Sequence, residues 1–170
     1  MIKISVIVPA YNEAGSILDM LKKVNAQSVD GFCFEIIVID DGSTDGTGQL
    51  LKNNGSFYSE LILLDKNGGK GSAVKAGLQK ASGEYVLFQD ADLEYDPDDY
   101  CKLFLPITKF QADVVMGSRM IAPQYTRVSY FWNKVGNKFI TFIFFPQEYL
   151  NITIMYFCFV ADRKIINILF

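Results

Sequence analysis

The sequence contains no histidine, and this absence excludes several kinds of catalytic site. Without imidazole there is no Ser-His-Asp or Cys-His nucleophile, no histidine-ligated zinc and no imidazole base. Any chemistry must therefore use carboxylates, Lys, Arg, Tyr, backbone groups, or a metal ion that is held by oxygen atoms.

Cysteines and long apolar runs are also scarce. The three cysteines, Cys33, Cys101 and Cys158, are far apart, so we expect reduced core residues in a cytosolic protein rather than a zinc site or a disulfide framework. No uninterrupted apolar run reaches the roughly 18 residues that span a bilayer. The net charge of −3 gives no basic excess of the kind that nucleic-acid binding requires.

What remains is a chain of 170 residues, 50% of them hydrophobic, which predicts one domain with a sizeable core. Short β-branched runs alternate with helical patterns, and this alternation predicts an α/β fold with a mainly parallel sheet and helices on both faces. Ser43 or Thr44 is expected to cap the second helix, and Gly83 to end the third. The predicted strands are 3–9, 34–39, 61–64, 85–89 and 112–116.

Polar motifs follow each of these strands. They are "PAYNE", "DDGSTD", "KNGGKG", "DAD" and "GSR", in chain order. Because ligands bind outside the carboxyl ends of the strands in such sheets, the motifs predict one shared site.

Asp90 and Asp92 carry the clearest chemical signal in these motifs. Two residues apart on an extended chain, both carboxylates point to the same side. Such close like charges favour a shared cation, and an oxygen-only site suits Mg²⁺ or Mn²⁺, with Glu94 as a further ligand. A solvated acidic loop is the alternative interpretation.

The other motifs are individually less specific. Asp41 is a candidate to bind a base or ribose, whereas Asp40 is expected to support the turn. "KNGGKGSA" suggests a phosphate loop, yet it fits neither the nucleoside-triphosphate nor the dinucleotide glycine pattern. Arg119 suits a bidentate phosphate contact or, equally, a surface salt bridge.

Taken in order, "SVIVPAYNE", "IIVIDDGSTDGT", "NGGKGSAVKAG", "SGEYVLFQDADLEYDP" and "DVVMGSR" closely resemble the family 2 glycosyltransferases. Within that family the resemblance is to the polyprenyl-phosphate sugar synthases, dolichyl-phosphate mannosyltransferases among them. It covers residues 4 to about 141 and implies the GT-A nucleotide-diphospho-sugar transferase fold. We expect a single domain over 1–170, with a donor-binding part at about 1–120 and an acceptor-side part at about 121–170.

The resemblance also implies the roles of individual residues. The sugar-nucleotide diphosphate would lie at Asp90, Ala91 and Asp92, with Arg119 on the phosphates and Asp92 and Arg119 as catalytic residues. Asn137 and Lys138 would face the acceptor phosphate. The base and ribose would be bound by Pro9, Tyr11, Glu13, Ile39 and Asp41.

The reaction implied is inverting, metal-assisted transfer of a hexose from a GDP-mannose or UDP-glucose type of donor to a polyprenyl or dolichyl phosphate. We expect Mg²⁺ or Mn²⁺ as cofactor and no nucleic-acid partner. The protein is expected at the cytosolic face of a membrane, held by the membrane surface or by a membrane-anchoring partner. The apolar stretches 139–146 and 155–160 are expected to be core elements or a surface that rests on lipid.

The C-terminal end departs from the family pattern T-D-M-E-x-C-Y-K-x-F-R. Ile154 and Tyr156 replace its two acidic residues, and the chain stops at Phe170. We therefore expect this chain to bind a nucleotide sugar with Mg²⁺ or Mn²⁺ but to transfer the sugar slowly or not at all. A truncated nucleotide-sugar-binding domain without turnover is one alternative. A transferase of the same fold with a polysaccharide or another acceptor is the second.

Overall fold

The computed structural model describes residues 1–92, 96–116, 159–164 and 166. The chain divides into two compact units, of which the first comprises Met1–Val115 and Cys158–Phe170. The second unit, Met116–Phe157, lies outside the described residues except for Met116. The proposed division into donor and acceptor parts therefore stays a prediction.

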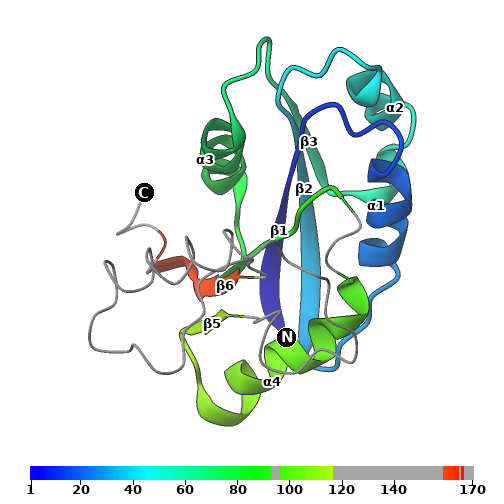
Figure 1. Cartoon of the computed structure of the whole chain (residues 1–170). Coiled ribbons are helices and arrows are strands. Elements are labelled where there is room, and N and C mark those ends of the chain that lie inside the picture. The colour runs from blue at the N-terminus through cyan, green and yellow to red at the C-terminus, as the bar shows by residue number, and fades with distance from the viewer. Residues whose placement is uncertain (93–95, 117–158, 165, 167–170) are drawn as a thin grey trace, which may run out of the picture. The chain divides into compact units, whose positions relative to one another are not determined.

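A six-stranded sheet in the order β3-β2-β1-β4-β6-β5 forms the centre of this unit (Figure 1). β1 pairs in parallel with β2 and β4, and β2 pairs in parallel with β3, which confirms the predicted mainly parallel sheet. The strands are β1 (Ile2–Ala10), β2 (Phe32–Asp40), β3 (Glu60–Leu63), β4 (Tyr85–Phe88), β5 (Val114–Met116) and β6 (Phe159–Asp162).

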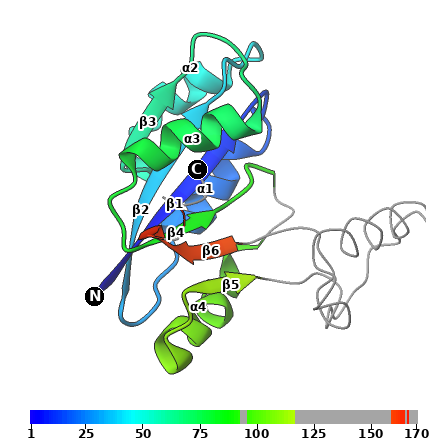
Figure 2. The same cartoon turned by 90° about the vertical axis from the view of Figure 1, so that its left-hand side faces the viewer.

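Helices cover both faces of the sheet, as the alternation of elements predicts (Figures 1 and 2). α1 (Ile17–Asn25), α2 (Thr47–Lys52) and α4 (Tyr100–Phe110) pack on one face, and α3 (Lys70–Lys80) packs on the other. Short 3₁₀ helices are η1 (Gly55–Phe57) and η2 (Pro97–Asp99). Within the described ranges, every helix is too short or too polar to cross a bilayer.

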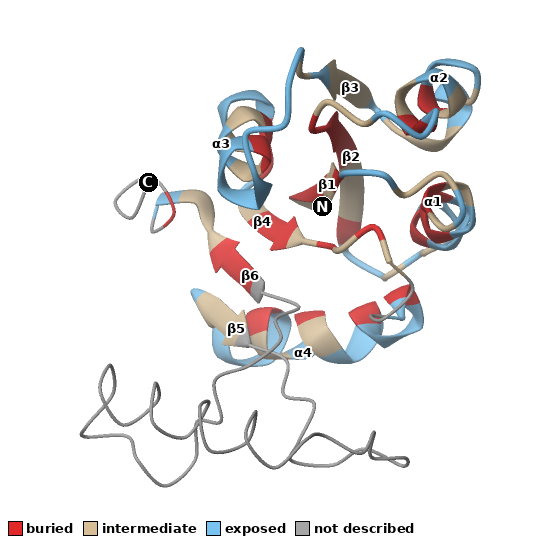
Figure 3. Ribbon diagram, turned by 45° about the horizontal axis from the view of Figure 1, so that its top comes forward, coloured by how far each residue is buried: buried red, intermediate tan, exposed pale blue. Residues whose placement is uncertain are grey.

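β1, β2 and β4 are buried on both faces because their side chains alternate between two hydrophobic clusters (Figure 3). Val6 and Val8 of β1 belong to the cluster under α1, whereas Ile7 belongs to the cluster under α3. In β4, Leu87 belongs to the cluster under α1 and Val86 to the cluster under α3. This two-sided burial explains why the strands read as continuous apolar runs rather than as alternating ones.

Strand β6 was not among the predicted strands. It pairs antiparallel with β4, and it separates β4 from β5. Val160 and Ala161 are fully buried on opposite faces, so this end of the apolar stretch 155–160 is core rather than a lipid-facing surface. Residues 155–158 and 139–146 lie outside the described residues.

Two of the predicted helix ends were wrong. α2 begins after Gly46, which has a left-handed φ of 95° and stands at the N-cap position in place of Ser43 or Thr44. α3 ends at Lys80, before Gly83. Gly83 instead lies where β1 and β4 come together, because a Cβ there would be 2.6 Å from the backbone nitrogen of Ser5. The glycine thus permits close backbone packing rather than a helix cap.

A polar network around Glu35 joins β1, β2 and the turn before β4. The Glu35 carboxylate accepts hydrogen bonds from Lys3 Nζ and Ser5 Oγ at 2.7 Å each, and from the backbone N–H of Ser82 at 2.9 Å. Ser5 Oγ in turn accepts from the N–H of Gly83. Burial alone raises the pKa of Glu35, but the hydrogen bonds from Lys3, Ser5 and Ser82 lower that pKa from 4.5 to about 2.

We expect Glu35→Gln to lower the free energy of unfolding by about 2 kcal/mol at pH 7, because charge-assisted hydrogen bonds are lost. The folded pKa lies below the unfolded one, so this contribution is complete above pH 4.5 and is lost as the pH falls toward about 2. Urea unfolding of both proteins between pH 3 and pH 7 measures the difference.

Glu60→Gln is the matched control, since Glu60 forms an exposed ion pair with Lys80 at 3.2 Å. That variant should change stability little at any pH. A difference between wild type and Glu35→Gln that does not shrink in acid would contradict the assignment of the low pKa to Glu35.

Candidate functional site

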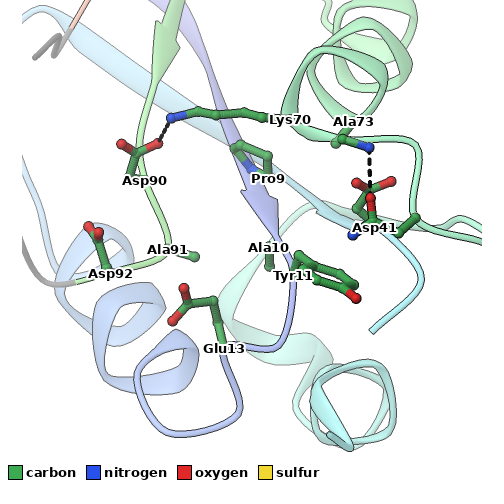
Figure 4. Close-up of a pocket in the computed structure, with 12 residues that line it drawn as sticks. Pro9, Ala10, Tyr11, Glu13, Asp41, Lys70, Ala73, Asp90, Ala91 and Asp92 are labelled. Atoms are coloured by element: carbon green, nitrogen blue, oxygen red, sulfur yellow. Dashed lines mark hydrogen bonds and ion pairs between the residues drawn. The ribbon is translucent and has the colours of Figure 1, made fainter. Parts of the chain in front are cut away.

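The sheet order creates a cleft between the loops that follow β1 and β4. From β1 the chain adds β2 and β3 on one side, and β4 then joins the other side of β1. The loops that leave the carboxyl ends of β1 and β4 therefore part at this point, where ligands bind in open α/β sheets. A cavity of about 360 Å³ lies there (Figure 4). It is lined by Pro9, Ala10, Tyr11, Glu13, Asp41, Asn67, Gly69, Lys70, Ala73, Asp90, Ala91 and Asp92.

Most of the predicted donor-site residues meet in this cavity. They are Pro9, Tyr11, Glu13, Asp41, Asp90, Ala91 and Asp92. Ile39 does not line it, because its side chain is fully buried in the cluster under α3. Glu94, Arg119, Asn137 and Lys138 lie outside the described residues, so their roles stay predictions.

Asp41 lies at the base of the cavity and is only 2% exposed. Its Oδ1 accepts a hydrogen bond from the N–H of Gly68 at 2.9 Å, which ties the end of β2 to the glycine-rich loop before α3. Gly42 makes the tight approach possible, with a φ of 68° and a Cβ position only 2.6 Å from the carbonyl carbon of Lys66. A side chain at residue 42 would displace this loop.

Asp40 plays the supporting role that the sequence predicts. Its Oδ1 accepts a hydrogen bond from the N–H of Ser43 at 3.3 Å, within the turn that follows β2. The residue is 5% exposed and does not line the cavity. Of the two adjacent carboxylates, that of Asp40 therefore supports the turn and that of Asp41 lines the cavity.

Asp90 and Asp92 place two carboxylates on one side of the cavity, as predicted (Figure 4). The chain bends at Ala91 and Asp92 rather than staying extended, so it is the loop and not strand pleating that directs them. Lys70 Nζ lies 2.5 Å from Asp90 Oδ1, and the lysine side chain is far more exposed than the aspartate. A mobile ammonium thus balances the negative charge of Asp90.

These donors suit a divalent cation that also binds a phosphate. Among the described residues there is no cluster of three or more metal-ligating side chains. Mg²⁺ and Mn²⁺ are commonly held by one or two carboxylates together with substrate phosphates and water. The carboxylates of Asp90 and Asp92 fit that pattern, and Glu94 stays a predicted third ligand.

The loops after β1 and β2 are locked together beside the cavity. Asn12 has a left-handed φ of 56°, and its backbone N–H donates to Ser43 Oγ at 2.9 Å. Asn12 Oδ1 accepts from the N–H of Thr44 at 2.8 Å. Ser43 and Thr44 therefore bind the neighbouring loop instead of capping α2.

Asp45 and Thr47 complete this lock. Asp45 accepts hydrogen bonds from the N–H of Ala14 and from the hydroxyl and N–H of Thr47. The Thr47 hydroxyl, followed by the two backbone N–H groups, lowers the pKa of Asp45. Thr47 Oγ1 also accepts from the N–H of Glu13 at 2.9 Å. These bonds fix the loop that carries Tyr11 and Glu13 at the cavity.

Lys70, Asn67 and Gly69 line the cavity but were not predicted as site residues. The "KNGGKG" motif was interpreted as a phosphate loop, so the signal for these three residues was present in the sequence. Ala10 and Ala73 were also missed. Their small apolar side chains carry no chemical signal, and only the fold brings them to the cavity.

The family model described as "Glycosyl transferase family 2" matches residues 5–169. A similar curated protein is the dolichol-phosphate mannosyltransferase of Pyrococcus furiosus, 35% identical over 120 residues, or 70% of this chain and 34% of the relative. The match thus spans about a third of that protein's length.

Two solved structures resemble this fold over nearly the whole chain. Glucosyl-3-phosphoglycerate synthase from Mycobacterium tuberculosis, in complex with Mn²⁺, UDP and glucosyl-3-phosphoglycerate, has a TM-score of 0.71 at 22% identity, with 96% of this chain and 57% of that one covered. A mannosyltransferase from Pyrobaculum calidifontis, in complex with GDP-mannose and Mn²⁺, has a TM-score of 0.65 at 22% identity, with coverages of 98% and 46%. These likenesses confirm the GT-A fold.

The lock at Asn12 predicts a local loss of stability when its side chain is removed. Asn12→Ala should lower the free energy of unfolding by about 1–2 kcal/mol, because a hydrogen bond is lost and alanine tolerates a left-handed φ poorly. Asn12→Gly restores the backbone freedom but not the hydrogen bond, so its loss should be smaller. Urea unfolding of the three proteins tests this order, and equal stability of wild type and Asn12→Ala would contradict it.

Proposed function

Because the chain belongs to glycosyl transferase family 2, we propose that its cavity binds a nucleotide-diphospho-sugar and that the protein transfers the hexose to a polyprenyl or dolichyl phosphate. One observation carries this proposal. The cavity at the switch point of the sheet brings together the aromatic ring of Tyr11, the buried carboxylate of Asp41, and residues 90–92, called here the acidic loop, which pair with Lys70. These groups correspond to the base, the ribose and the diphosphate of such a donor.

The nucleoside would bind at the ends of β1 and β2. The ring of Tyr11, which is 45% exposed, offers a surface on which a base can stack. Asp41 retains Oδ2 for a base or ribose hydrogen bond while Oδ1 binds Gly68. Pro9 and Glu13 also line the cavity and are proposed to contact the nucleoside, as is Ile39, which lies in the core next to Asp40.

The diphosphate would bind at the acidic loop. Asp90, Asp92 and Glu94 would hold Mg²⁺ or Mn²⁺, and the Mn²⁺ complexes of the two similar structures support this choice. When bound, the ion neutralises charge on the departing diphosphate. Lys70 is well placed to move from Asp90 to a phosphate oxygen, and Arg119 is proposed as a second phosphate ligand.

The transfer itself would be an inverting displacement. An anionic oxygen of the acceptor phosphate attacks the anomeric carbon, the new carbon–oxygen bond forms, and the nucleoside diphosphate leaves with the electron pair of the broken bond. The acceptor oxygen carries its charge already and needs little help from a general base. This requirement suits a chain that contains no histidine.

The acceptor is proposed from the relative that acts, by its name, on dolichol phosphate. Asn137 and Lys138 would face the acceptor phosphate, and the protein would work at the cytosolic face of a membrane. A different acceptor, such as a polysaccharide, and donor binding without turnover are the two alternatives. Both alternatives use the same donor site as the main proposal. Assays of transfer to an acceptor therefore distinguish the three possibilities.

Asp92→Asn should abolish the Mn²⁺-dependent part of donor binding while the protein stays folded, because a neutral amide is a weak ligand for a hard divalent cation. Calorimetric titration with GDP- and UDP-sugars, with and without Mn²⁺, measures this part directly. Asp99→Asn is the control, since Asp99 pairs with Lys102 on the surface and lies outside the cavity lining. Unchanged affinity in Asp92→Asn would refute the metal assignment.

A transfer assay tests the reaction. The chain would be incubated with Mn²⁺, polyprenyl phosphate in detergent or membranes, and labelled GDP- and UDP-sugars, and the lipid extract would be counted. We expect acid-labile label in the lipid fraction at a rate below the order of 1 per second that is usual for enzymes, because Ile154 and Tyr156 replace the two acidic residues of the family pattern. Nucleotide-sugar binding without lipid label would favour one of the two alternatives, and absence of binding would refute the donor site.

A further inference from the structure

Two buried polar side chains lie beneath the acidic loop and outside the cavity. Gln89 follows β4 directly, and Tyr100 begins α4, and both are 0% exposed. Neither lines the cavity. Burying an amide and a hydroxyl costs free energy unless both groups are hydrogen-bonded. Gln89 and Tyr100 must therefore form hydrogen bonds, whereas two aliphatic residues at these positions would need none.

The hydrogen bonds of the pair lead to the backbone of the acidic loop. Tyr100 Oη donates to Gln89 Oε1 at 2.9 Å. Gln89 Nε2 donates to the carbonyl oxygen of Asp90 at 3.2 Å. The backbone N–H of Gln89 donates to the carbonyl of Ile7 at 3.0 Å, so the glutamine is anchored on β1 as well.

The position of the tyrosine hydroxyl is set by rigid surroundings. The ring of Tyr100 packs against Phe34 of β2 and Phe104 of α4, with ring centroids 5.8 Å and 5.6 Å apart. The backbone N–H of Tyr100 bonds to the carbonyl of Pro97 in η2. A side chain fixed by these contacts presents its donor at one point in space.

The acidic loop needs such support because the strand ends just before it. The pairing of β4 with β1 stops at Phe88 opposite Ile7, two residues before Asp90. Beyond Phe88, hydrogen bonds of the Gln89 side chain therefore hold the backbone in place of the β-sheet hydrogen bonds. They connect the backbone at Asp90 to α4, which belongs to the hydrophobic cluster beneath.

We propose that Gln89 and Tyr100 are positioning residues, which hold the backbone of the acidic loop so that Asp90 and Asp92 meet the metal–diphosphate group. This inference rests on the proposed function of the cavity. It concerns neither substrate contact nor a proton transfer, since both side chains are buried away from the cavity. The affinity of the donor site for its ligand then depends in part on two buried residues that do not contact the ligand.

Tyr100→Phe tests the inference, because it removes the hydroxyl and keeps the ring that packs on Phe34 and Phe104. Tyr58→Phe is the matched control. Its hydroxyl donates to the backbone carbonyl of Leu51 at 2.7 Å, in a region that lies outside the cavity lining. Both variants lose one hydrogen bond of a tyrosine, so both should lose a similar amount of stability.

The measurement is the gain in affinity for GDP or UDP that Mn²⁺ produces, from titrations with Mn²⁺ and with EDTA at a temperature where circular dichroism shows all proteins folded. We expect this gain to fall roughly three- to tenfold in Tyr100→Phe, the equivalent of one hydrogen bond, and to stay at the wild-type value in Tyr58→Phe. Nucleotide affinity in EDTA should be the same for all three proteins. A general loss of stability would not reduce the Mn²⁺-dependent gain while leaving the affinity in EDTA unchanged.

Hydrogen–deuterium exchange provides a second measurement on the same proteins. Peptides that cover residues 86–92 should exchange faster in Tyr100→Phe than in wild type or Tyr58→Phe. Equal metal-dependent gains in wild type and Tyr100→Phe would overturn the positioning role and leave the donor site intact. Failure of wild type itself to bind either nucleotide with Mn²⁺ would overturn the proposed function, and the inference with it.

Discussion

Strand β1 carries the interaction on which the rest of the structure depends. It forms parallel hydrogen-bond ladders with β2 on one side and β4 on the other, and it is buried on both faces. Because both ladders are parallel, the carboxyl ends of β1, β2 and β4 lie at the same edge of the sheet, and the loops that follow them emerge together. Tyr11, Asp41 and Asp90 meet in one cavity for this reason, although they are far apart along the chain.

The sequence was most informative where structure is set by local patterns. Runs of β-branched residues predicted the five strands β1 to β5, and polar motifs at their ends predicted most of the cavity lining. β6 was missed because a strand of four residues, Phe159–Asp162, depends on a partner far away along the chain. Capping rules failed at Ser43 and Gly83 for a related reason, since tertiary contacts with Asn12 and Ser5 determine their conformations.

Within the site, chemistry was easier to predict than geometry. A pair of acidic residues indicates a cation site, so Asp90 and Asp92 were candidate ligands from the sequence alone. The choice between Asp40 and Asp41 agreed with the structure. Ile39 was assigned to the site by the family resemblance, but it packs in the core, away from the cavity lining. Gln89 and Tyr100 carry no motif at all. Only the fold shows that a glutamine beside the acidic loop meets a hydroxyl eleven residues further along.

The position of β6 between β4 and β5 has an evolutionary consequence. The chain leaves the sheet at the end of β5, and it re-enters the sheet in the adjacent strand after residues 117–158. Neighbouring ends give an insertion fixed points of attachment, and each doubling of its length adds only about 0.6 kcal/mol of loop-closure entropy. The segment can therefore be exchanged or lengthened while β1, β2 and β4 stay as they are. Such an arrangement separates the strands whose ends line the cavity from the part of the chain that is free to vary.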